Sequence, residues 1–245
     1  MDSKSNQIIK GNKLYEGKAK IIFLTNHQDL LIQHFKDSAT AFNGVKKAII
    51  NEKGQLNNLI SEVIMIKLAK NGIANHFISR IDNREQLIKK VKIIPLEVII
   101  RNIVAGSLAK KFAIEEGLKI EQPIIEICYK DDSLGDPLIN DDHAINLLKI
   151  VTASQLQTIK NLALQINSLL QKIFLEADLL LVDFKIEFGF DSDFKIILAD
   201  EISPDSCRLW DIKTKQKLDK DVFRYDLGDV TKSYQIIAHR LGISF

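Results

Sequence analysis

Alternating charged and apolar side chains in residues 181–189 constrain the fold of this chain more than any other feature. The segment reads LVDFKIEFG, and a period of two is typical of a β-strand, whose successive side chains point to opposite faces. Asp183, Lys185 and Glu187 would share one face, while Val182 and the apolar residues that follow it at the same spacing would share the other. We predict a strand with one face in the core and one face carrying charges.

A second acidic pair follows this strand closely. Asp200 and Glu201 end another predicted strand, residues 194–199, and a two-residue turn at 191–192 would place Asp200 opposite Asp183. Clustered carboxylates are unfavourable unless a cation lies among them, and oxygen ligands suit Mg²⁺ brought in by a nucleotide. The alternative interpretation is a solvated, charged strand face.

The remaining patterns mix strands and helices without a regular βαβ alternation, which indicates an α+β fold. Thr152 and Gln155 form a capping box at the start of a long amphipathic helix that we expect to pack across a sheet. We predict strands in 13–36, in 76–104 with a break at Pro95, and in 179–190 and 194–199. We predict helices at 57–70, stopped by Asn71 and Gly72, and at 152–178 and 229–240.

Residues 94–107 form a second candidate site. Strand parity places Glu97 and Arg101 on the same face, among apolar neighbours. Gly106 and Ser107 then open a short predicted helix, with Ser107 as the N-cap residue, whose free N–H groups could bind an anion. These features predict a pocket for a phosphate or a carboxylate. The alternative is an internal Glu97–Arg101 ion pair and an ordinary helix cap.

Two lysines near the N-terminus could bind phosphates. Lys18 and Lys20 follow Gly17 and would share a strand face, although exposed lysines at alternating positions are common. The sequence contains neither a GxxxxGK[ST] nor a GxGxxG motif, so a nucleotide would be bound without a P-loop or a Rossmann fingerprint.

Composition limits the classes of protein that remain. The 245 residues are 46% hydrophobic and carry a net charge of +2, so any anion site must be local. We expect a cytoplasmic location and reduced thiols at Cys128 and Cys207, because residues 1–11 hold no apolar signal core. Lys, Asp, Asn or Glu interrupt every apolar run, so no membrane span is expected. The histidines show no metal-ligand spacing, and we expect them to be structural or exposed.

Taken together, these segments resemble the SAICAR synthetase family, whose members are phosphoribosylaminoimidazole-succinocarboxamide synthases. Its most diagnostic motifs match residues 95–107 and 182–189. Further matching segments are 14–20, 39–44, 135–138, 200–206 and 208–211. The motifs agree in order, and their number makes a chance match far less probable than one motif would.

The resemblance implies a two-lobed α+β fold with ATP and Mg²⁺ between the lobes. We place the lobe boundary near residue 93, before Pro95, which gives a β-rich lobe of residues 1–93 and an α+β lobe of residues 94–245. It also implies a reaction in which ATP, L-aspartate and carboxyaminoimidazole ribotide (CAIR) give the succinocarboxamide SAICAR, ADP and phosphate through an acyl phosphate. Bacterial relatives are often homodimers, which makes a homodimer possible here.

The resemblance also assigns roles to residues. Catalytic roles fall to Lys185, Asp183, Glu187 and Asp200, and Glu187 and Asp200 would also hold the metal. ATP would contact Lys18, Ala19, Lys20, Val91 and Ile93 as well as the two metal ligands. The substrates would contact Arg101, Ser107, Arg208, Arg224, Asp37 and Thr40.

Two other functions are considered beside this one. A phosphotransferase that uses the same nucleotide site on another acceptor would release ADP without aspartate. A nucleic-acid-binding module could use the basic segments 89–92 and 213–220, but these lack interleaved aromatic residues and belong to a nearly neutral chain. Steep salt-dependent binding to DNA or RNA would favour the second alternative, and we expect no nucleic-acid or membrane partner.

Overall fold

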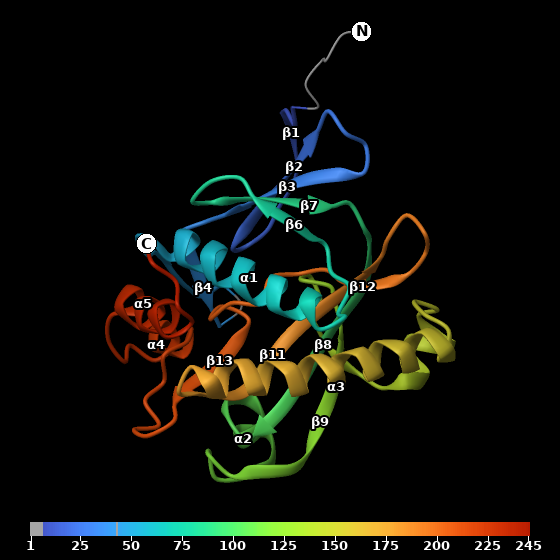
Figure 1. Cartoon of the computed structure of the whole chain (residues 1–245). Helices are drawn as coiled ribbons and strands as arrows, with labels where there is room; N and C mark the ends of the chain where they lie inside the picture. The colour runs from blue at the N-terminus through green and yellow to red at the C-terminus, as the bar shows by residue number, and fades with distance from the viewer. Residues whose placement is uncertain (1–6, 43) are drawn as a thin grey trace, which may run out of the picture.

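A computed structural model describes residues 7–42 and 44–245 and contains two large antiparallel sheets (Figure 1). Asn43, which belongs to the matched segment 39–44, lies outside the described residues. The first sheet has the order β1-β2-β3-β7-β6. Its strands are β1 (Lys10–Glu16), β2 (Lys20–Thr25), β3 (Leu30–Phe35), β6 (Phe77–Arg80) and β7 (Glu85–Lys89). The predicted N-terminal strands are therefore confirmed.

The second sheet contains the charged strand at its centre. Its order is β10-β9-β8-β11-β12, and β13 also pairs with β11. Its strands are β8 (Lys92–Ile103), β9 (Lys119–Tyr129), β10 (Leu138–Ile139), β11 (Leu179–Phe190), β12 (Ile196–Leu198) and β13 (Cys207–Asp211). A small separate hairpin pairs β4 (Ser38–Ala41) with β5 (Lys46–Ile49).

Helices cover the second sheet and its junction with the first. The chain forms α1 (Lys53–Lys70), α2 (Gly106–Phe112), the π-helix η1 (His143–Leu147), α3 (Ala153–Glu176), α4 (Asp221–Arg224) and α5 (Val230–Arg240). The long helix α3 lies along one face of the β8–β11 sheet, while α1 packs against α5 and against strands of the first sheet (Figure 1). Among the described helices, none has the length and apolar character that crossing a bilayer requires.

Local signals explain the helix boundaries. Thr152 accepts a hydrogen bond from the backbone N–H of Gln155, whose side chain accepts from the N–H of Thr152, so the predicted capping box is confirmed. Helix α1 ends at Lys70, before Asn71 as predicted, but begins at Lys53 rather than at Asn57. The mixed sheets and helices confirm the α+β class.

The predicted break at Pro95 is wrong, because β8 runs through it. A proline cannot donate to a strand ladder, and it is tolerated where the ladder is irregular. The pairing of β8 with β11 shifts register between Glu187 and Gly189, which lie opposite Glu97 and Ile93. On the other side of β8, the Pro95 carbonyl accepts from the N–H of Lys130 at 3.0 Å. The missing N–H therefore falls at a bulge.

A second bulge corrects the position predicted for Val182. The ladder of β11 with β13 shifts register between Leu181 and Asp183. Leu181 and Phe184 both belong to the main core, whereas Val182 packs in a small separate cluster with Ala105 and Trp210. The alternation thus changes phase at the bulge, and Val182 does not share the core face of Phe184.

Candidate active site

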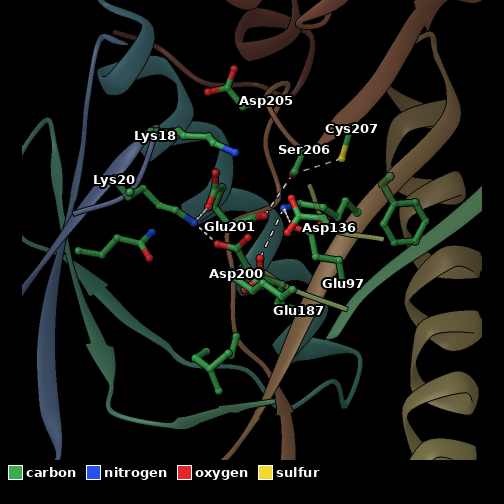
Figure 2. Close-up of a pocket in the computed structure, with 18 of the residues that line it drawn as sticks. Lys18, Lys20, Glu97, Asp136, Glu187, Asp200, Glu201, Asp205, Ser206 and Cys207 are labelled. Carbon is green, nitrogen blue, oxygen red and sulfur yellow. Dashed lines mark hydrogen bonds and ion pairs between the residues drawn. The ribbon is translucent and has the colours of Figure 1, made fainter. Parts of the chain in front are cut away.

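A cleft of about 610 Å³ lies between the two sheets. The first sheet contributes its wall through β2, β3 and β7, and the second sheet contributes β8, β11 and β13. Apolar residues of the wall include Leu14, Ile22, Leu31, Ile88, Val91 and Ile93. Figure 2 shows that acidic and basic side chains from distant parts of the sequence meet in this cleft. A cavity of this size, with apolar walls and a few polar groups, is typical of a small-molecule site.

Glu187 and Asp200 lie beside each other at the end of β11. The connection between β11 and β12 spans residues 191–195 and pairs Phe190 with Ile196, and the N–H of Ala199 donates to the carbonyl of Glu187 at 3.0 Å. The expected pairing of Asp200 with Asp183 is wrong because the turn is longer than two residues. The register instead places Asp200 next to Glu187, where both carboxylates are buried.

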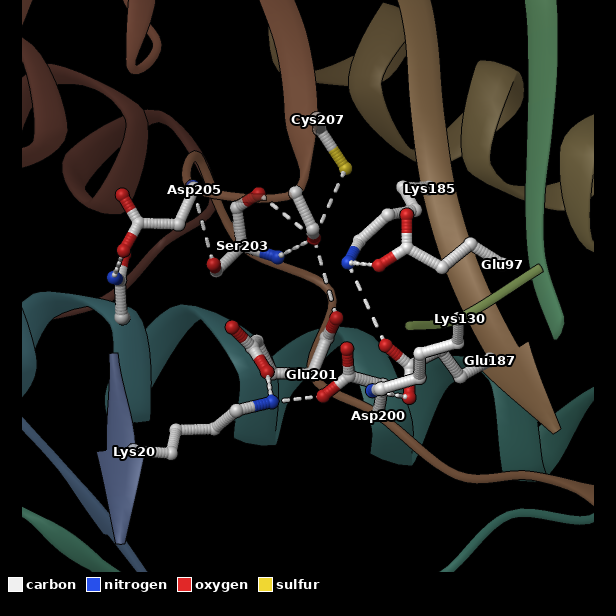
Figure 3. Close-up of polar contacts among 12 residues, drawn as sticks. Lys20, Glu97, Lys130, Lys185, Glu187, Asp200, Glu201, Ser203, Asp205 and Cys207 are labelled. Carbon is white, nitrogen blue, oxygen red and sulfur yellow. Dashed lines mark hydrogen bonds and ion pairs between the residues drawn. The ribbon is translucent and has the colours of Figure 1, made fainter. Parts of the chain in front are cut away.

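Three lysines neutralise these carboxylates and form, with their partners, what we call the lysine cluster (Figure 3). Lys20 contacts both Asp200 and Glu201, and Lys130 contacts Glu187. Lys185 donates to Glu97 at 2.5 Å and lies 3.5 Å from Glu187. Charges from both sheets and from the strand end near Lys130 therefore converge at one point.

The two carboxylates of the cluster have shifted pKa values of opposite sign. Burial, together with the charge of Asp200, raises the pKa of Glu187 above its usual value. Burial acts most strongly on Asp200 and opposes its ionisation, but the charges of Lys20, Lys185 and Lys130 together outweigh it and lower the pKa of Asp200. Although burial opposes it, the charges of Glu187 and Glu97 raise the pKa of Lys185, which stays protonated. The cluster is thus a site of dense, compensated charge.

The lysine cluster fits a nucleotide-borne Mg²⁺. Among residues 7–42 and 44–245, no group of three or more His, Cys, Asp or Glu side chains is arranged to hold a metal by itself. Mg²⁺ commonly takes only one or two protein carboxylates and completes its shell with phosphate oxygens and water. Glu187 and Asp200 are adjacent and buried, and they supply the two carboxylates that such a shared ion needs.

A different set of residues surrounds Asp183 and forms what we call the arginine cluster. Asp183 accepts from Arg101 at 2.9 Å and from Arg208 at 2.8 Å. Arg208 also donates to Asp221 at 2.9 Å, and Arg224 donates to the other oxygen of Asp221 at 2.6 Å. The alternative considered from the sequence, an ion pair of Glu97 with Arg101, does not form. Glu97 pairs instead with Lys185 and Arg101 with Asp183, both on β11.

Ser107 belongs to the arginine cluster and is not a helix cap. Helix α2 begins at Gly106 with Ala105 in the N-cap position, so the predicted N-cap role of Ser107 is wrong. The Ser107 hydroxyl instead accepts from Arg101 at 3.1 Å. Gly106 has φ of 55°, and a Cβ there would lie 2.5 Å from Nη2 of Arg208. Glycine is therefore required both by the backbone and by the close approach of the guanidinium.

The structure brings most of the predicted site residues to the cleft and leaves two outside it. Lys18, Ala19, Val91, Ile93 and Arg224 line the cleft together with the members of the two clusters. Lys18 is exposed and pairs across the rim with Asp132 at 2.7 Å.

Asp37 and Thr40 are not among the residues that line the cleft. Asp37 accepts two hydrogen bonds from Arg84, at 2.7 and 2.8 Å, and one from the N–H of Gly54. Burial opposes ionisation, but the Arg84 bonds hold the pKa of Asp37 below its usual value. Asp37 thus fixes the start of α1 against the first sheet.

Sequence reasoning missed several charged residues of the cleft. Lys130 and Lys220 line it, as does Asp205, whose side chain is 4% exposed. Glu201, which the sequence placed beside Asp200, lines it as well. Lys130 follows β9 outside any motif, and only three-dimensional pairing brings it to Glu187. His76 also lines the cleft; burial lowers its pKa to about 4, which keeps it neutral, as expected for a structural histidine.

Comparison with known proteins identifies this arrangement. A family model described as SAICAR synthetase matches residues 13–241. The phosphoribosylaminoimidazole-succinocarboxamide synthase of Bacillus subtilis is 57% identical over 96% of this chain and 97% of its own length. The crystal structure of the synthase from Ehrlichia chaffeensis is 50% identical with a TM-score of 0.93, covering 96% of this chain and all of that one. A SAICAR synthetase solved in complex with ADP is 45% identical, with a TM-score of 0.89 over 93% of this chain and 96% of its own.

Proposed function

Because the chain belongs to the SAICAR synthetase family, it catalyses the ATP-dependent joining of L-aspartate to CAIR in purine biosynthesis, and we propose how the cleft performs this reaction. The observation that carries the proposal is that Asp183, Lys185 and Glu187 of one strand link the arginine cluster to the lysine cluster. One end of the cleft suits a ribotide and the other suits a nucleotide.

The reaction needs an activated carboxylate. An oxygen of the CAIR carboxylate attacks the γ-phosphorus of ATP, the bond from that phosphorus to ADP breaks, and an acyl phosphate forms. The amine of aspartate then attacks the carboxyl carbon, the bond to phosphate breaks, and the amine loses a proton. The resulting amide, ADP and phosphate account for all the atoms.

The lysine cluster would hold the triphosphate. Lys18 and Lys20 would contact the phosphates, with the backbone at Ala19, while Val91 and Ile93 would contact adenine. Glu187 and Asp200 would hold Mg²⁺, which when bound supplies charge neutralisation for phosphoryl transfer. The protein's own contribution is to replace water around the phosphates with fixed ammonium groups.

The strand residues between the clusters would act at the reacting carbon. Lys185 is kept protonated by Glu97 and Glu187, and it would hold the reacting carboxylate of CAIR. Asp183 would orient that carboxylate or the imidazole amine. Arg101, Ser107, Arg208 and Arg224 would bind the ribotide, its 5′-phosphate or the aspartate carboxylates, because guanidinium forks match such anions.

Asp37 and Thr40 remain candidates for substrate contact on the strength of the family motif alone. Their positions outside the cleft lining favour a supporting role, in which Asp37 holds the segment before α1. We propose the division into lobes at residues 1–93 and 94–245. The first sheet ends with β7 at Lys89 and β8 begins at Lys92, so this division falls just inside β8.

Substrate omission tests the reaction. Purified protein with ATP, CAIR, aspartate and Mg²⁺ should release ADP, and omitting CAIR or aspartate should abolish the release. ADP release that continues without aspartate would support a phosphotransferase instead. CAIR labelled with ¹⁸O in its carboxylate should transfer one label to each phosphate; unlabelled phosphate would argue against the acyl phosphate.

We also propose that the chain acts in the cytoplasm, as a homodimer, and with small molecules as its only partners. The exposed apolar side chains of Phe112, Ile114 and Leu118, which follow one another on and after α2, offer surface for a second copy. Light scattering on the protein as it elutes from a size-exclusion column should give twice the mass of one chain, which is 27.8 kDa. A mass equal to one chain would contradict the dimer, and cell fractionation would test the location.

A further inference from the structure

Lys220 differs from the other cations of the cleft. Lys20, Lys130 and Lys185 each contact a carboxylate, and so do the cleft arginines of the arginine cluster. Lys220 lines the same cleft and is partly buried, yet within residues 7–42 and 44–245 its ammonium has neither a hydrogen bond nor an ion pair. A partly buried cation without a partner is unfavourable, so the position calls for an anion that the protein does not supply.

The backbone holds Lys220 firmly at the wall of the cleft. Its N–H donates to the carbonyl of Pro204 at 3.1 Å, and its own carbonyl accepts from Phe223 and Arg224 at the start of α4. It lies between Asp219 and Asp221, both fully buried. The side chain therefore extends from a fixed point at the cleft wall.

Asp205, the carboxylate that acts most strongly on Lys220, is already satisfied. Asp205 accepts from Lys53 at 2.5 Å and from Asn57 at 2.9 Å, and its other oxygen accepts from the Tyr234 hydroxyl at 2.8 Å. The nearby cations Arg224, Lys53 and Lys185 oppose the charge of Lys220. Burial lowers the pKa of Lys220, and the charge of Asp205 offsets this only in part. The nearby cations lower the pKa of Lys220 further.

The position of Lys220 limits which anion can bind it. The charges of Lys185 and Arg224 both act on the Lys220 ammonium. Lys185 belongs to the lysine cluster beside the reacting carboxylate, and Arg224 belongs to the arginine cluster. In the amide product, the amine nitrogen of aspartate is bonded to the carbon of that reacting carboxylate, so the two aspartate carboxylates lie a few bonds away from it. An anion held between Lys185 and Arg224 therefore suits a carboxylate of the amino acid.

We propose that Lys220 binds a carboxylate of aspartate and so positions its amine for attack on the activated ribotide. This assignment rests on the proposed function of the cleft and adds a residue to it. Among the described residues that line the cleft, Lys220 is the partly buried cation without a partner, whereas the other unpaired one, Lys89, is exposed to solvent. The amino acid would supply the missing partner of Lys220 on binding.

Steady-state kinetics with Lys220→Met tests the proposal. The KM for aspartate should rise about 10- to 100-fold, the range of a lost charge-assisted hydrogen bond. The KM values for ATP and CAIR should stay unchanged. Lys213→Met, which removes an exposed lysine of the same segment outside the cleft lining, should leave all three constants unchanged.

Two further measurements separate carboxylate binding from a structural or a proton-transfer role. Because Lys220 has no partner in the free protein, Lys220→Met should melt at the same or a higher temperature. Lys220→Arg keeps the positive charge but cannot give up its proton at working pH, so it should recover most of the aspartate affinity.

An unchanged aspartate KM in Lys220→Met would overturn the assignment, and so would a rise in the KM for CAIR alone. A Lys220→Arg variant that keeps the wild-type KM for aspartate but loses turnover would also overturn it, because that result would mean that Lys220 acts as a base. Failure of the proposed function would be seen separately, as wild-type ADP release that does not depend on aspartate.

Discussion

The lysine cluster and the arginine cluster solve the same electrostatic problem differently. Both neutralise buried carboxylates of β11, Glu187 in one case and Asp183 in the other. A lysine ammonium is a compact charge on a flexible stem, whereas a guanidinium is a planar fork that fixes its partner's orientation. The lysine contacts can therefore be exchanged for contacts to phosphates and a metal ion, while the arginine contacts hold a rigid frame.

The largest effect is expected from breaking the rigid frame. Asp183→Asn leaves Arg101 and Arg208 buried without the carboxylate that both contact. Removing their shared partner costs up to about 3 kcal/mol of unfolding free energy here, since Arg101 keeps Glu126 and Arg208 keeps Asp221 as carboxylate partners. Urea denaturation followed by circular dichroism would measure this loss, and turnover should fall with it.

A matched change at an exposed ion pair provides the control for Asp183→Asn. Asp141 pairs with Lys160 at 2.6 Å, but its side chain is 54% exposed. Asp141→Asn should change the unfolding free energy by less than about 1 kcal/mol. Equal losses in the two variants would mean that Asp183 does not hold a rigid frame.

Glu187→Gln should separate activity from stability. Burial and the charge of Asp200 already raise the pKa of Glu187, so removing its charge should leave the melting temperature unchanged or raise it. If Glu187 shares Mg²⁺ with the nucleotide, the Mg²⁺ concentration for half-maximal turnover should rise at least about 10-fold, since even outer-shell changes weaken metal binding that much.

Titration of turnover against Mg²⁺ measures the effect of Glu187→Gln. Glu62, whose carboxylate pairs with Arg80 on the surface, offers the control Glu62→Gln, which should behave as wild type. Unchanged activity of Glu187→Gln at every Mg²⁺ concentration would mean that Glu187 does not bind the metal. Its contacts with lysine would then be structural, like those of the arginine cluster.

Beside the arginine cluster lies a carboxyl group, Asp219, that makes no ion pair within the part of the chain that the structure describes, and this gives a pH effect. Asp219 is fully buried and accepts the N–H groups of Leu209 and Asp221, both at 2.8 Å. Burial, followed by the charge of Asp221, raises its pKa from 3.8 to about 7. Between these values the folded state retains a proton that the unfolded state loses. The stability that Asp219 contributes is therefore complete below about pH 4 and is lost as the pH rises to 7.

Asp219→Asn removes this titration. From pH 4 to pH 7 the wild type should lose unfolding free energy relative to the variant, by at most about 1.4 kcal/mol for each pH unit. Urea titrations at several pH values measure the difference, with the exposed Asp226→Asn as control. A difference that does not change with pH would mean that Asp219 is ionised in the folded protein throughout.

How much of these two clusters could be predicted depended on whether local sequence determines the geometry. The alternation of residues 181–189 and the capping box at Thr152 are local, and both patterns predicted the correct element. The pairing of Asp200 with Glu187 depends on turn length, and the phase change at Val182 depends on a bulge, neither of which composition determines. Lys130 and Lys220 could not be found, because distant strands and loops bring them to the cleft.

The smallest effect is expected at the exposed rim of the lysine cluster. Lys18 and Asp132 pair at 2.7 Å across the cleft, with side chains 53% and 64% exposed. Asp132→Asn should change the unfolding free energy by less than about 1 kcal/mol, and salt should remove the difference. Since Lys18 is proposed to contact phosphate, freeing it should lower the KM for ATP at low salt, whereas Asp193→Asn, at the exposed pair with Lys195, should not. A higher KM for ATP in Asp132→Asn would mean that the rim pair is part of the frame and that the lysine contacts there are not exchangeable.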